Sequence, residues 1–263
     1  MNMKISIIGS GNIGSALATG LLREGGINPG DIVLTDITQE ALEPFAAKGV
    51  RTMQDNVEAV KNARIVILCV KPFQANEVIE EILPALADDA LLVSFAAGIS
   101  LDQLSLSAGQ RPLFRVIPNT AMAICRSMTC FVASNDTDIA QQNTVTQLFS
   151  RVGKVMIIDE TLIDAATVVA ACGTAFALRY MRAAMSAAVE IGFRPAAAEA
   201  MIAQTMLGAA LLVTELGNHP EVEIDKVTTP KGITIKGLTE MERAGFSLAA
   251  MQGIYAAYDK LRS

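Results

Sequence analysis

A glycine-rich turn follows the first apolar segment of the chain. Lys4–Ile8 is rich in Ile and predicts a strand, and Gly14–Glu24 has helical spacing. Between them, Gly9–Gly14 has the pattern Gly-x-Gly-x-x-Gly, which in this context lets the backbone turn tightly, approach a pyrophosphate and pack closely. The N–H groups at the start of the helix would attract phosphate. We therefore predict a dinucleotide site, the alternative being an ordinary glycine-rich turn. Its predicted phosphate-binding residues are Gly9, Gly11, Asn12, Ile13 and Gly14.

Strand and helix patterns alternate through the first 160 residues. Asp31–Thr35, Arg64–Val70 and Ala90–Phe95 are predicted strands, and the second is almost fully apolar, as in the centre of a parallel sheet. Such alternation predicts an α/β fold with a Rossmann-like, doubly wound sheet. Further predicted elements are the helices Gln39–Lys48, Asn56–Lys61, Gln74–Leu86, Leu101–Leu106 and Asp138–Val152, and the strands Pro112–Val116, Met128–Val132 and Lys154–Ile158.

The composition changes after Glu160. Residues 165–215 are rich in Ala, poor in charge and free of any strand pattern. Helices are predicted at Leu162–Val189, Pro195–Leu216 and Ser247–Leu261, and Pro195 suits the first position of its helix. We expect two domains: a dinucleotide-binding domain at 1–160 and an all-helical domain at 161–263.

The overall composition is apolar but poor in aromatic residues. Hydrophobic residues make up 51% of the 263 residues, aromatic residues 5%, and Trp is absent. A core of small aliphatic side chains and Met suits closely packed helices. With 18% charged residues the chain is too apolar for a disordered protein. The apolar excess indicates either a membrane protein or a protein that buries much of its surface in an oligomer.

The apolar runs favour the second interpretation. The two best candidates, Ala165–Leu178 and Ala200–Val213, are bounded by charged residues and are shorter than the roughly 18 apolar residues of a spanning helix. Met1–Lys4 leads directly into the first strand, which leaves no room for a secretory signal. We therefore expect a cytoplasmic protein without membrane contact. A net charge of −6 and the lack of a basic run predict no nucleic-acid partner.

The cysteine and histidine content predicts neither a metal site nor a His-based triad. The four cysteines lack the Cys-x-x-Cys spacing of metal ligands, and we expect them to be reduced and buried. The single histidine, His219, is expected to be a turn or cap residue.

Asp36 follows the second predicted strand and favours NADH. A carboxylate at this place accepts hydrogen bonds from the ribose hydroxyls of NAD and repels the 2′-phosphate of NADP. Residues 36–40 contain no cation that would bind that phosphate. The alternative is that Asp36 caps the helix that begins near Gln39.

Later segments resemble the pyrroline-5-carboxylate reductases, in the same order and over nearly the whole chain. The longest matches are Arg115-Val116-Ile117-Pro118-Asn119-Thr120, similar to Arg-x-Met-Pro-Asn-Thr-Pro, and Val227–Ile235, similar to Val-Thr-Ser-Pro-Gly-Gly-Thr-Thr-Ile. The other matching segments are Val70-Lys71-Pro72, Ala96–Ser100, Gln204–Ala210 with His219-Pro220, and Gly237-Leu238 with Glu242 and Gly245-Phe246.

The resemblance implies the reduction of 1-pyrroline-5-carboxylate to L-proline, the last step of proline biosynthesis, by hydride transfer from NAD(P)H to C5. It places the Thr234 hydroxyl near the imine nitrogen and implies Lys71 as the second catalytic residue. Thr229, Gly232 and Ile233 would hold the substrate carboxylate, an anion that successive backbone N–H groups can bind. Asn119 would contact substrate and cofactor. The nicotinamide would be lined by Val70, Lys71, Pro72, Ala97 and Asn119, and the adenosine ribose would contact Asn56.

The resemblance also implies a homodimer, or a higher oligomer built from dimers, with helices interleaved between subunits. The resemblance implies NADPH as the cofactor, whereas Asp36 favours NADH. Two alternatives without a functional role stay open. Lys71 could be a solvated surface lysine, and Asn119 could be a turn residue after Pro118.

Three departures from the family pattern leave other functions open. Ser-Gly-Ser-Gly-Pro-Ala-Tyr is replaced by Ala170–Phe176, Lys231 replaces a Gly, and Asp36-Ile37 replaces Asn-Arg. The alternatives are a sister reductase for another small imine or keto compound, and a catalytically weak paralogue that binds dinucleotide for regulation. A β-hydroxyacid dehydrogenase is disfavoured because residues 161–190 contain no Lys.

Overall fold

The computed structural model describes residues 4–23 and 26–262, so Met1–Met3 and the predicted helix end at Glu24 lie outside it. The chain forms two compact units, Met1–Cys172 with Leu261–Ser263, and Gly173–Lys260. The division falls later than the predicted boundary after Glu160. Ile163 and Val168 are buried, and Ile163 belongs to a core cluster of the first unit, which explains why the start of the helical region stays with the sheet.

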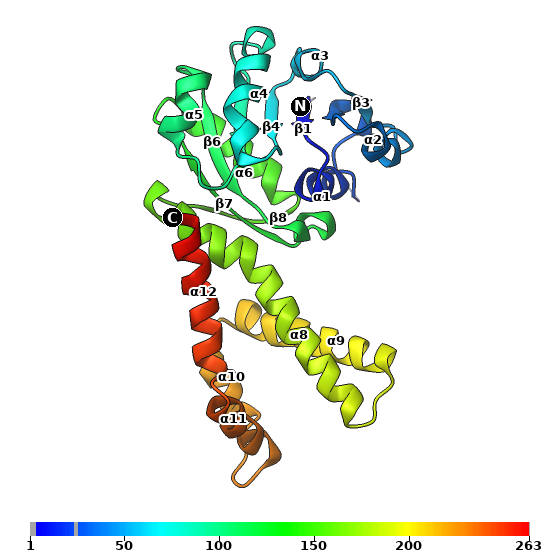
Figure 1. Ribbon diagram of the computed structural model, residues 1–263, viewed down its shortest axis with the longest axis vertical. Coiled ribbons are helices and arrows are strands. Elements are labelled where there is room, and N and C mark those ends of the chain that lie inside the picture. Colours follow the sequence, from blue (N-terminus) through cyan, green and yellow to red (C-terminus); the bar gives the residue numbers. More distant parts are fainter. Residues whose placement is uncertain (1–3, 24–25, 263) are drawn as a thin grey trace. The chain divides into compact units, whose positions relative to one another are not determined.

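The first unit is built on one eight-stranded sheet with the order β3-β2-β1-β4-β5-β6-β7-β8 (Figure 1). The first six strands, in the order 3-2-1-4-5-6, form the parallel dinucleotide-binding arrangement, which confirms the predicted fold class. β7 pairs antiparallel with β6, and β8 pairs parallel with β7. The strands are β1 Ile5–Ile8, β2 Ile32–Thr35, β3 Arg51–Met53, β4 Ile65–Leu68, β5 Leu91–Ser94, β6 Leu113–Ile117, β7 Ser127–Ala133 and β8 Gly153–Ile157.

Short helices connect these strands. Most agree with the predicted helices to within a few residues at each end. The α-helices are α1 Asn12–Leu21, α2 Gln39–Ala46, α3 Asn56–Val60, α4 Ala75–Ile82, α5 Leu101–Ala108 and α6 Ile139–Ser150. The 3₁₀ turns are η1 Pro29–Asp31, η2 Pro72–Gln74, η3 Leu83–Ala85, η4 Thr120–Ile124 and η5 Glu160–Leu162.

The strand β3 was not predicted. It has three residues, Arg51–Met53, all of them exposed or half-buried, and it pairs only with β2 at the sheet edge. Such a strand is held by backbone hydrogen bonds to its neighbour, and its side chains therefore carry no hydrophobic pattern that identifies it.

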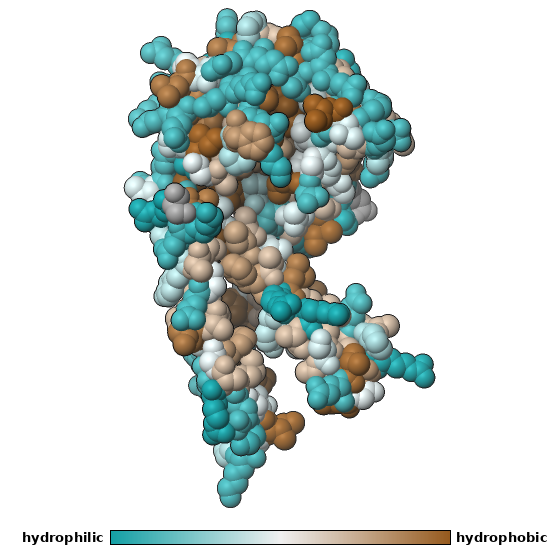
Figure 2. Space-filling model, viewed as in Figure 1, coloured by the Kyte–Doolittle hydropathy of each residue, from teal (hydrophilic) through white to brown (hydrophobic). Residues whose placement is uncertain are grey.

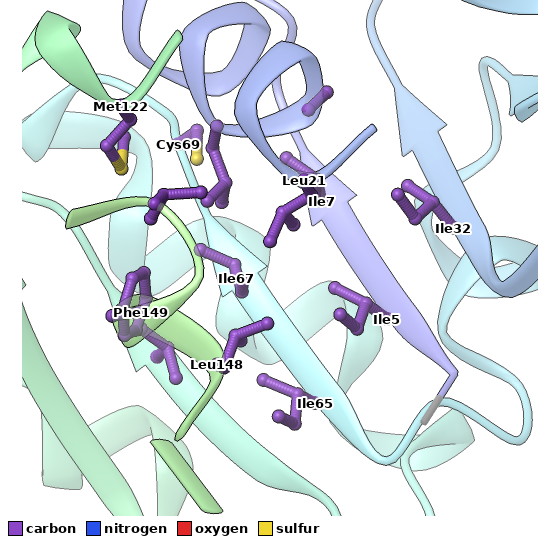
Figure 3. Packing of buried hydrophobic residues seen from close by; sticks show 14 of the residues in the cluster. Ile5, Ile7, Leu21, Ile32, Ile65, Ile67, Cys69, Met122, Leu148 and Phe149 are labelled. Atoms are coloured by element: carbon purple, nitrogen blue, oxygen red, sulfur yellow. The ribbon is translucent and has the colours of Figure 1, made fainter. Parts of the chain in front are cut away.

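The central strands are buried on both faces because helices cover both. Along β4, Ile65 and Ile67 belong to one core cluster, whereas Val66 and Leu68 belong to the other, as the alternation of side chains in a strand requires. The first cluster packs the sheet against α1, α2 and α6, and Figure 3 shows Leu21 of α1 and Leu148 and Phe149 of α6 around the isoleucines of β1 and β4. The second cluster packs it against α3, α4 and α5.

After the last strand the chain continues as consecutive helical pieces of different types. After η5 it forms α7, Ile163–Ala166, and then a π-helix, Thr167–Cys172. The predicted helix Leu162–Val189 is therefore divided into these pieces and α8, Gly173–Glu190.

The second unit is all helical, as predicted. Pro195 occupies the first turn of α9, and His219 caps α10 by accepting a hydrogen bond from the Glu221 N–H at Nδ1, 3.3 Å away, so both expectations are confirmed. α10 and α11 were not predicted as helices, because their sequences are polar and α10 has only 7 residues. The helices that follow α8 are α9 Pro195–Leu216, α10 Pro220–Lys226, α11 Ile233–Arg243 and α12 Phe246–Arg262.

The second unit exposes most of its apolar side chains. Within residues 173–260, all of which are described, Ala198 is the only buried hydrophobic residue. Ile191 is 77% exposed and Leu207 is 52% exposed, and Figure 2 shows tan and brown atoms over much of these helices. Two stretches, Glu160–Glu190 and Pro195–Leu216, are long and apolar enough to span a membrane by length and composition alone, which the run-length estimate from the sequence did not anticipate.

The buried aromatic residues of the first unit test the packing of its core. We expect Phe149→Ala to lower the free energy of unfolding by about 3–5 kcal/mol, because Phe149 is fully buried and the truncation leaves a cavity. The control is Phe73→Ala, since Phe73 is 83% exposed, and here we expect a change under about 0.5 kcal/mol. Denaturant unfolding measures both, and equal effects would contradict this packing.

Candidate functional site

The turn between β1 and α1 can be built only with glycine at two places. Gly9 has φ of 99°, and a Cβ there would lie 2.7 Å from the carbonyl oxygen of Cys69. A Cβ on Gly14 would lie 2.0 Å from the carbonyl oxygen of Gly9. Helix α1 thus begins directly against the ends of β1 and β4, as the glycine pattern predicts.

The start of α1 is open to a ligand. Gly11 is its N-cap residue and supplies no side-chain hydrogen bond, and a Cβ on Gly11 would meet nothing within 4 Å. The first N–H groups of the helix therefore lack side-chain capping and face open space, where an anion can approach them.

A cavity of about 420 Å³ lies at this turn, at the carboxyl ends of β1, β2 and β4. It brings together eight of the predicted cofactor residues but not Gly14, Pro72, Ala97 or Asn119. Ile37, Gln74 and Val78 also line it but were not predicted as site residues, because Gln74 and Val78 carry no motif and Ile37 marks only a departure from the family pattern. The predicted residues in the cavity are Gly9, Gly11, Asn12, Ile13, Asp36, Asn56, Val70 and Lys71.

Asp36 is fixed in place by the glycine turn itself. Its Oδ2 accepts hydrogen bonds from the Ser10 N–H at 2.8 Å and the Ser10 hydroxyl at 2.9 Å, and its Oδ1 accepts one from the Thr38 N–H at 2.9 Å. Partial burial acts to raise the pKa of Asp36, but the bonds from Thr38 and Ser10 together hold that pKa below its ordinary value. The carboxylate therefore keeps its charge at neutral pH. Thr38, not Asp36, is the N-cap residue of α2, so the capping alternative is wrong.

Asn56 is the first residue of α3, which follows β3, and it lines the same cavity as Asp36. Its Oδ1 accepts a hydrogen bond of 2.7 Å from the Thr35 hydroxyl, and its Nδ2 donates one of 3.2 Å to Glu81. Asp55, and not Asn56, caps α3 by accepting from the Glu58 N–H. Asn56 is thus held at the cavity wall with its side chain in one orientation.

Lys71 is the only cation among the residues that line this cavity in the described chain. It follows β4 and precedes η2, and its backbone N–H donates to Gln74 Oε1 at 3.3 Å. Its ammonium forms no ion pair with any residue that the structure describes. A free cation at the mouth of a phosphate-binding turn suits an anionic ligand.

Asn119 is 9% exposed, and both ends of its amide bind within the protein. Its Oδ1 accepts from the Ala121 N–H at 3.0 Å, and its Nδ2 donates to the Ala170 carbonyl at 2.9 Å. Ala97, in the loop after β5, is half-buried, and Pro72 is exposed. None of these three lines the cavity.

The predicted carboxylate loop, Thr229–Thr234, is a tight turn that leads into α11. The Gly232 N–H donates to the Thr229 carbonyl at 2.9 Å, and Lys231 has φ of 60°. A left-handed residue after Pro suits Gly in a type II turn, and a Lys in this conformation costs about 1–2 kcal/mol. Lys231, Gly232, Ile235, Lys236 and Thr239 line an open hollow of about 350 Å³.

Two groups of this loop are available to a ligand. Ile233 and Thr234 open the first turn of α11, where backbone N–H groups have no acceptor within the helix. Thr234 is half-buried, and its hydroxyl makes no hydrogen bond with the described residues. The N–H of Gly232, in contrast, is already used in the turn.

The four cysteines are free, as predicted, although only Cys69 and Cys130 are buried and Cys125 and Cys172 are half-buried. Burial raises the pKa of both Cys69 and Cys130. Cys69 lies under the glycine turn as a neutral packing residue. The described residues include no group of three side chains that could hold a metal ion.

Comparisons with known proteins agree with both parts of the chain. Residues 160–263 match the family model described as pyrroline-5-carboxylate reductase dimerisation, and residues 4–98 match one described as NADP oxidoreductase, coenzyme F420-dependent. A solved structure of a pyrroline-5-carboxylate reductase from Coxiella burnetii is 28% identical, with a TM-score of 0.89, and the match covers 100% of this chain and 98% of that one.

Curated relatives carry the same name. Pyrroline-5-carboxylate reductase 1 of Dictyostelium discoideum is 37% identical over 98% of this chain, which spans 49% of that longer protein. Pyrroline-5-carboxylate reductase 2 of the same organism is 35% identical, and the match covers 98% of this chain and 92% of that protein. Because this second relative is 35% identical and the match covers almost the full length of that protein and of this chain, the chain belongs to the pyrroline-5-carboxylate reductase family.

Proposed function

We propose that this protein reduces 1-pyrroline-5-carboxylate to L-proline with a nicotinamide dinucleotide, the last step of proline biosynthesis. Family membership over 98% of the chain carries this proposal. The chemistry agrees with the site, because the cofactor supplies the hydride and the protein need only bind, orient and offer a proton donor. Neither a metal nor a His-based triad is required.

The residues present fit a dinucleotide. Open space above Gly11 and the uncapped start of α1 suit a pyrophosphate, which the N–H groups of the turn would hold. We assign Asp36 and Asn56 to the adenosine ribose, and Val70, Lys71, Pro72 and Ala97 to the nicotinamide side. Lys71 would offset the negative charge of the bound molecule. Because Asn119 is 9% exposed and does not line the cavity, we assign it no direct contact with cofactor or substrate.

The substrate carboxylate is assigned to the Thr229–Thr234 loop. The N–H groups of Ile233 and Thr234 lack helical acceptors and can donate to it, while Thr229 and Gly232 shape the turn. The free hydroxyl of Thr234 would donate a hydrogen bond to the imine nitrogen and so stabilise the negative charge that develops there, and supply the proton that the nitrogen takes up, as hydride reaches C5.

A second candidate is a sister reductase of this architecture that acts on another small imine or keto compound. It is favoured by the apolar Ala170–Phe176 segment, which lacks the hydroxyl groups of the family pattern. Turnover of a panel of such compounds in preference to 1-pyrroline-5-carboxylate would select it. A regulatory paralogue would bind the dinucleotide and turn over none of them.

The activity assay follows the absorbance of the reduced cofactor in the presence of 1-pyrroline-5-carboxylate. We expect Thr234→Ala to lower kcat by about tenfold to a hundredfold, because the hydroxyl that donates to the nitrogen as it gains charge is lost. The dissociation constant of the dinucleotide should not change. Thr234→Ser keeps the hydroxyl and should retain kcat within a few-fold. An unchanged kcat for Thr234→Ala would remove Thr234 from this role, and absence of turnover in the parent protein would refute the proposed reaction.

We further propose that NADH is the preferred cofactor, because the fixed charge of Asp36 opposes a 2′-phosphate. Asp36→Asn should raise the kcat/KM ratio of NADPH over NADH by about tenfold or more, since two like charges near a protein surface repel by on the order of 2 kcal/mol. The control is Asp31→Asn, just before the same strand, which should leave the ratio unchanged. A parent enzyme that turns over NADPH faster than NADH would contradict the assignment.

We also propose a homodimer, or a higher oligomer built from dimers, in the cytoplasm. The match to a dimerisation model and the exposed apolar side chains of the second unit support self-association. Light scattering should give at least twice the chain mass of 27.8 kDa. Leu207→Glu in α9 should shift the protein towards monomer, whereas Leu106→Glu in α5, at an 86% exposed leucine of the first unit, should not. A monomeric parent protein would be the contrary result.

A further inference from the structure

Two polar side chains of the Arg115–Thr120 segment bind one stretch of chain, the helical segment that leaves the sheet. Arg115 is 3% exposed and pairs with Glu160 at 3.2 Å and Asp164 at 3.7 Å. Asn119 donates to the Ala170 carbonyl at 2.9 Å. The helical segment that leaves the sheet is therefore held at two points, by Arg115 near its start and by Asn119 at Ala170.

The distances between the two contacts along the two elements are of the same order. Arg115 and Asn119 are four residues apart in extended backbone, which spans about 13 Å. Asp164 and Ala170 are six residues apart in helix, which spans about 9 Å. The end of β6 and the start of the helical segment can thus run side by side over this distance, with one polar contact near each end.

The contact of Asn119 falls in the π-helix Thr167–Cys172. A π-helix is rare and commonly marks a functional place in a protein. Its wider winding alters the hydrogen-bond ladder there, and the Ala170 carbonyl receives a donor from outside the helix. Ala171, next in the chain, packs against the same core cluster as Val70, which lines the dinucleotide cavity.

The orientation of the Asn119 amide is determined by its partners. Its oxygen faces the Ala121 N–H and its nitrogen faces a carbonyl, and a flipped amide would place like groups together. Its backbone N–H is also fixed, by donation to the Ser127 hydroxyl at 3.1 Å. Asn119 is therefore a rigid link between the sheet and the π-helix.

We propose that Asn119 is a positioning residue, which fixes the π-helical turn Thr167–Cys172 against the end of β6, with Arg115 anchoring the start of the same segment. Asn119 acts through Ala170 and does not itself contact the cofactor. The effect on turnover rests on the proposed reduction, but the effect on the π-helix does not.

The test compares Asn119→Asp with two other variants. Asn119→Asp keeps the shape but replaces the donor to Ala170 with an oxygen. Asn119→Ser loses the reach to Ala170 but keeps a cap acceptor for the Ala121 N–H, and it remains informative if the Asp variant fails to fold. Asn135→Asp makes the same chemical change at an exposed residue after β7 and serves as the control.

We expect amide hydrogen exchange over residues 167–172 to be at least tenfold faster in both Asn119 variants, with kcat at least tenfold lower. The dissociation constant of NADH should stay within about twofold of the parent value, and the control should change none of these. Unchanged exchange, or faster exchange with unchanged kcat, would overturn the proposal. Weaker NADH binding with unchanged exchange would make Asn119 a ligand contact instead. If the parent protein turns over no 1-pyrroline-5-carboxylate, the proposed reaction fails, while the exchange result still decides whether Asn119 holds the π-helix.

Discussion

The geometry of the candidate site in the first unit depends on the close approach of α1 to the central strands. A Cβ on Gly14 would lie 2.0 Å from the Gly9 carbonyl, and a Cβ on Gly9 would lie 2.7 Å from the Cys69 carbonyl. Only hydrogen atoms fit in these spaces, so the helix can begin at the strand ends with its N–H groups facing outwards. The cavity, the fixed orientation of Asp36 through Ser10 and the open space above Gly11 all depend on this approach. The same geometry packs α1 onto the sheet and creates a place for phosphate.

The two units bury their apolar residues differently. In the first, each central strand has helices on both faces, and residues such as Ile67 and Leu68 reach full burial within one chain. In the second, Ala198 alone is buried among the hydrophobic residues of 173–260. Small side chains let helices approach each other, but a few helices cannot enclose so much apolar surface. The apolar composition therefore has two sources. The core of the first unit is complete within the chain, whereas the apolar side chains of the second unit need a further surface to cover them.

The sequence predicted those features that have a local cause. The glycine turn, the alternating strands and the Pro195 helix start each follow from a few adjacent residues, and the structure confirms them. β3 escaped prediction because its pairing with β2, and not its side chains, makes it a strand. The bonds of Asn119 to Ala170 and of Arg115 to Asp164 join residues about fifty positions apart, and no spacing rule relates such pairs. Ile37, Gln74 and Val78 line the cavity only because the chain folds back on itself there.

The turn before α11 has a consequence for how this loop tolerates change. Lys231 holds a backbone conformation that glycine adopts freely, whereas at Gly232 a Cβ would lie 2.3 Å from the Thr229 hydroxyl oxygen. The two neighbours thus face opposite restrictions, one on torsion and one on volume. Exchanging their order, from Lys-Gly to Gly-Lys, would keep the composition of the loop and relieve the torsion, yet the new Cβ would require the Thr229 side chain to move. A side chain is thus accommodated at position 231 at the cost of its backbone torsion, and at position 232 only if Thr229 moves.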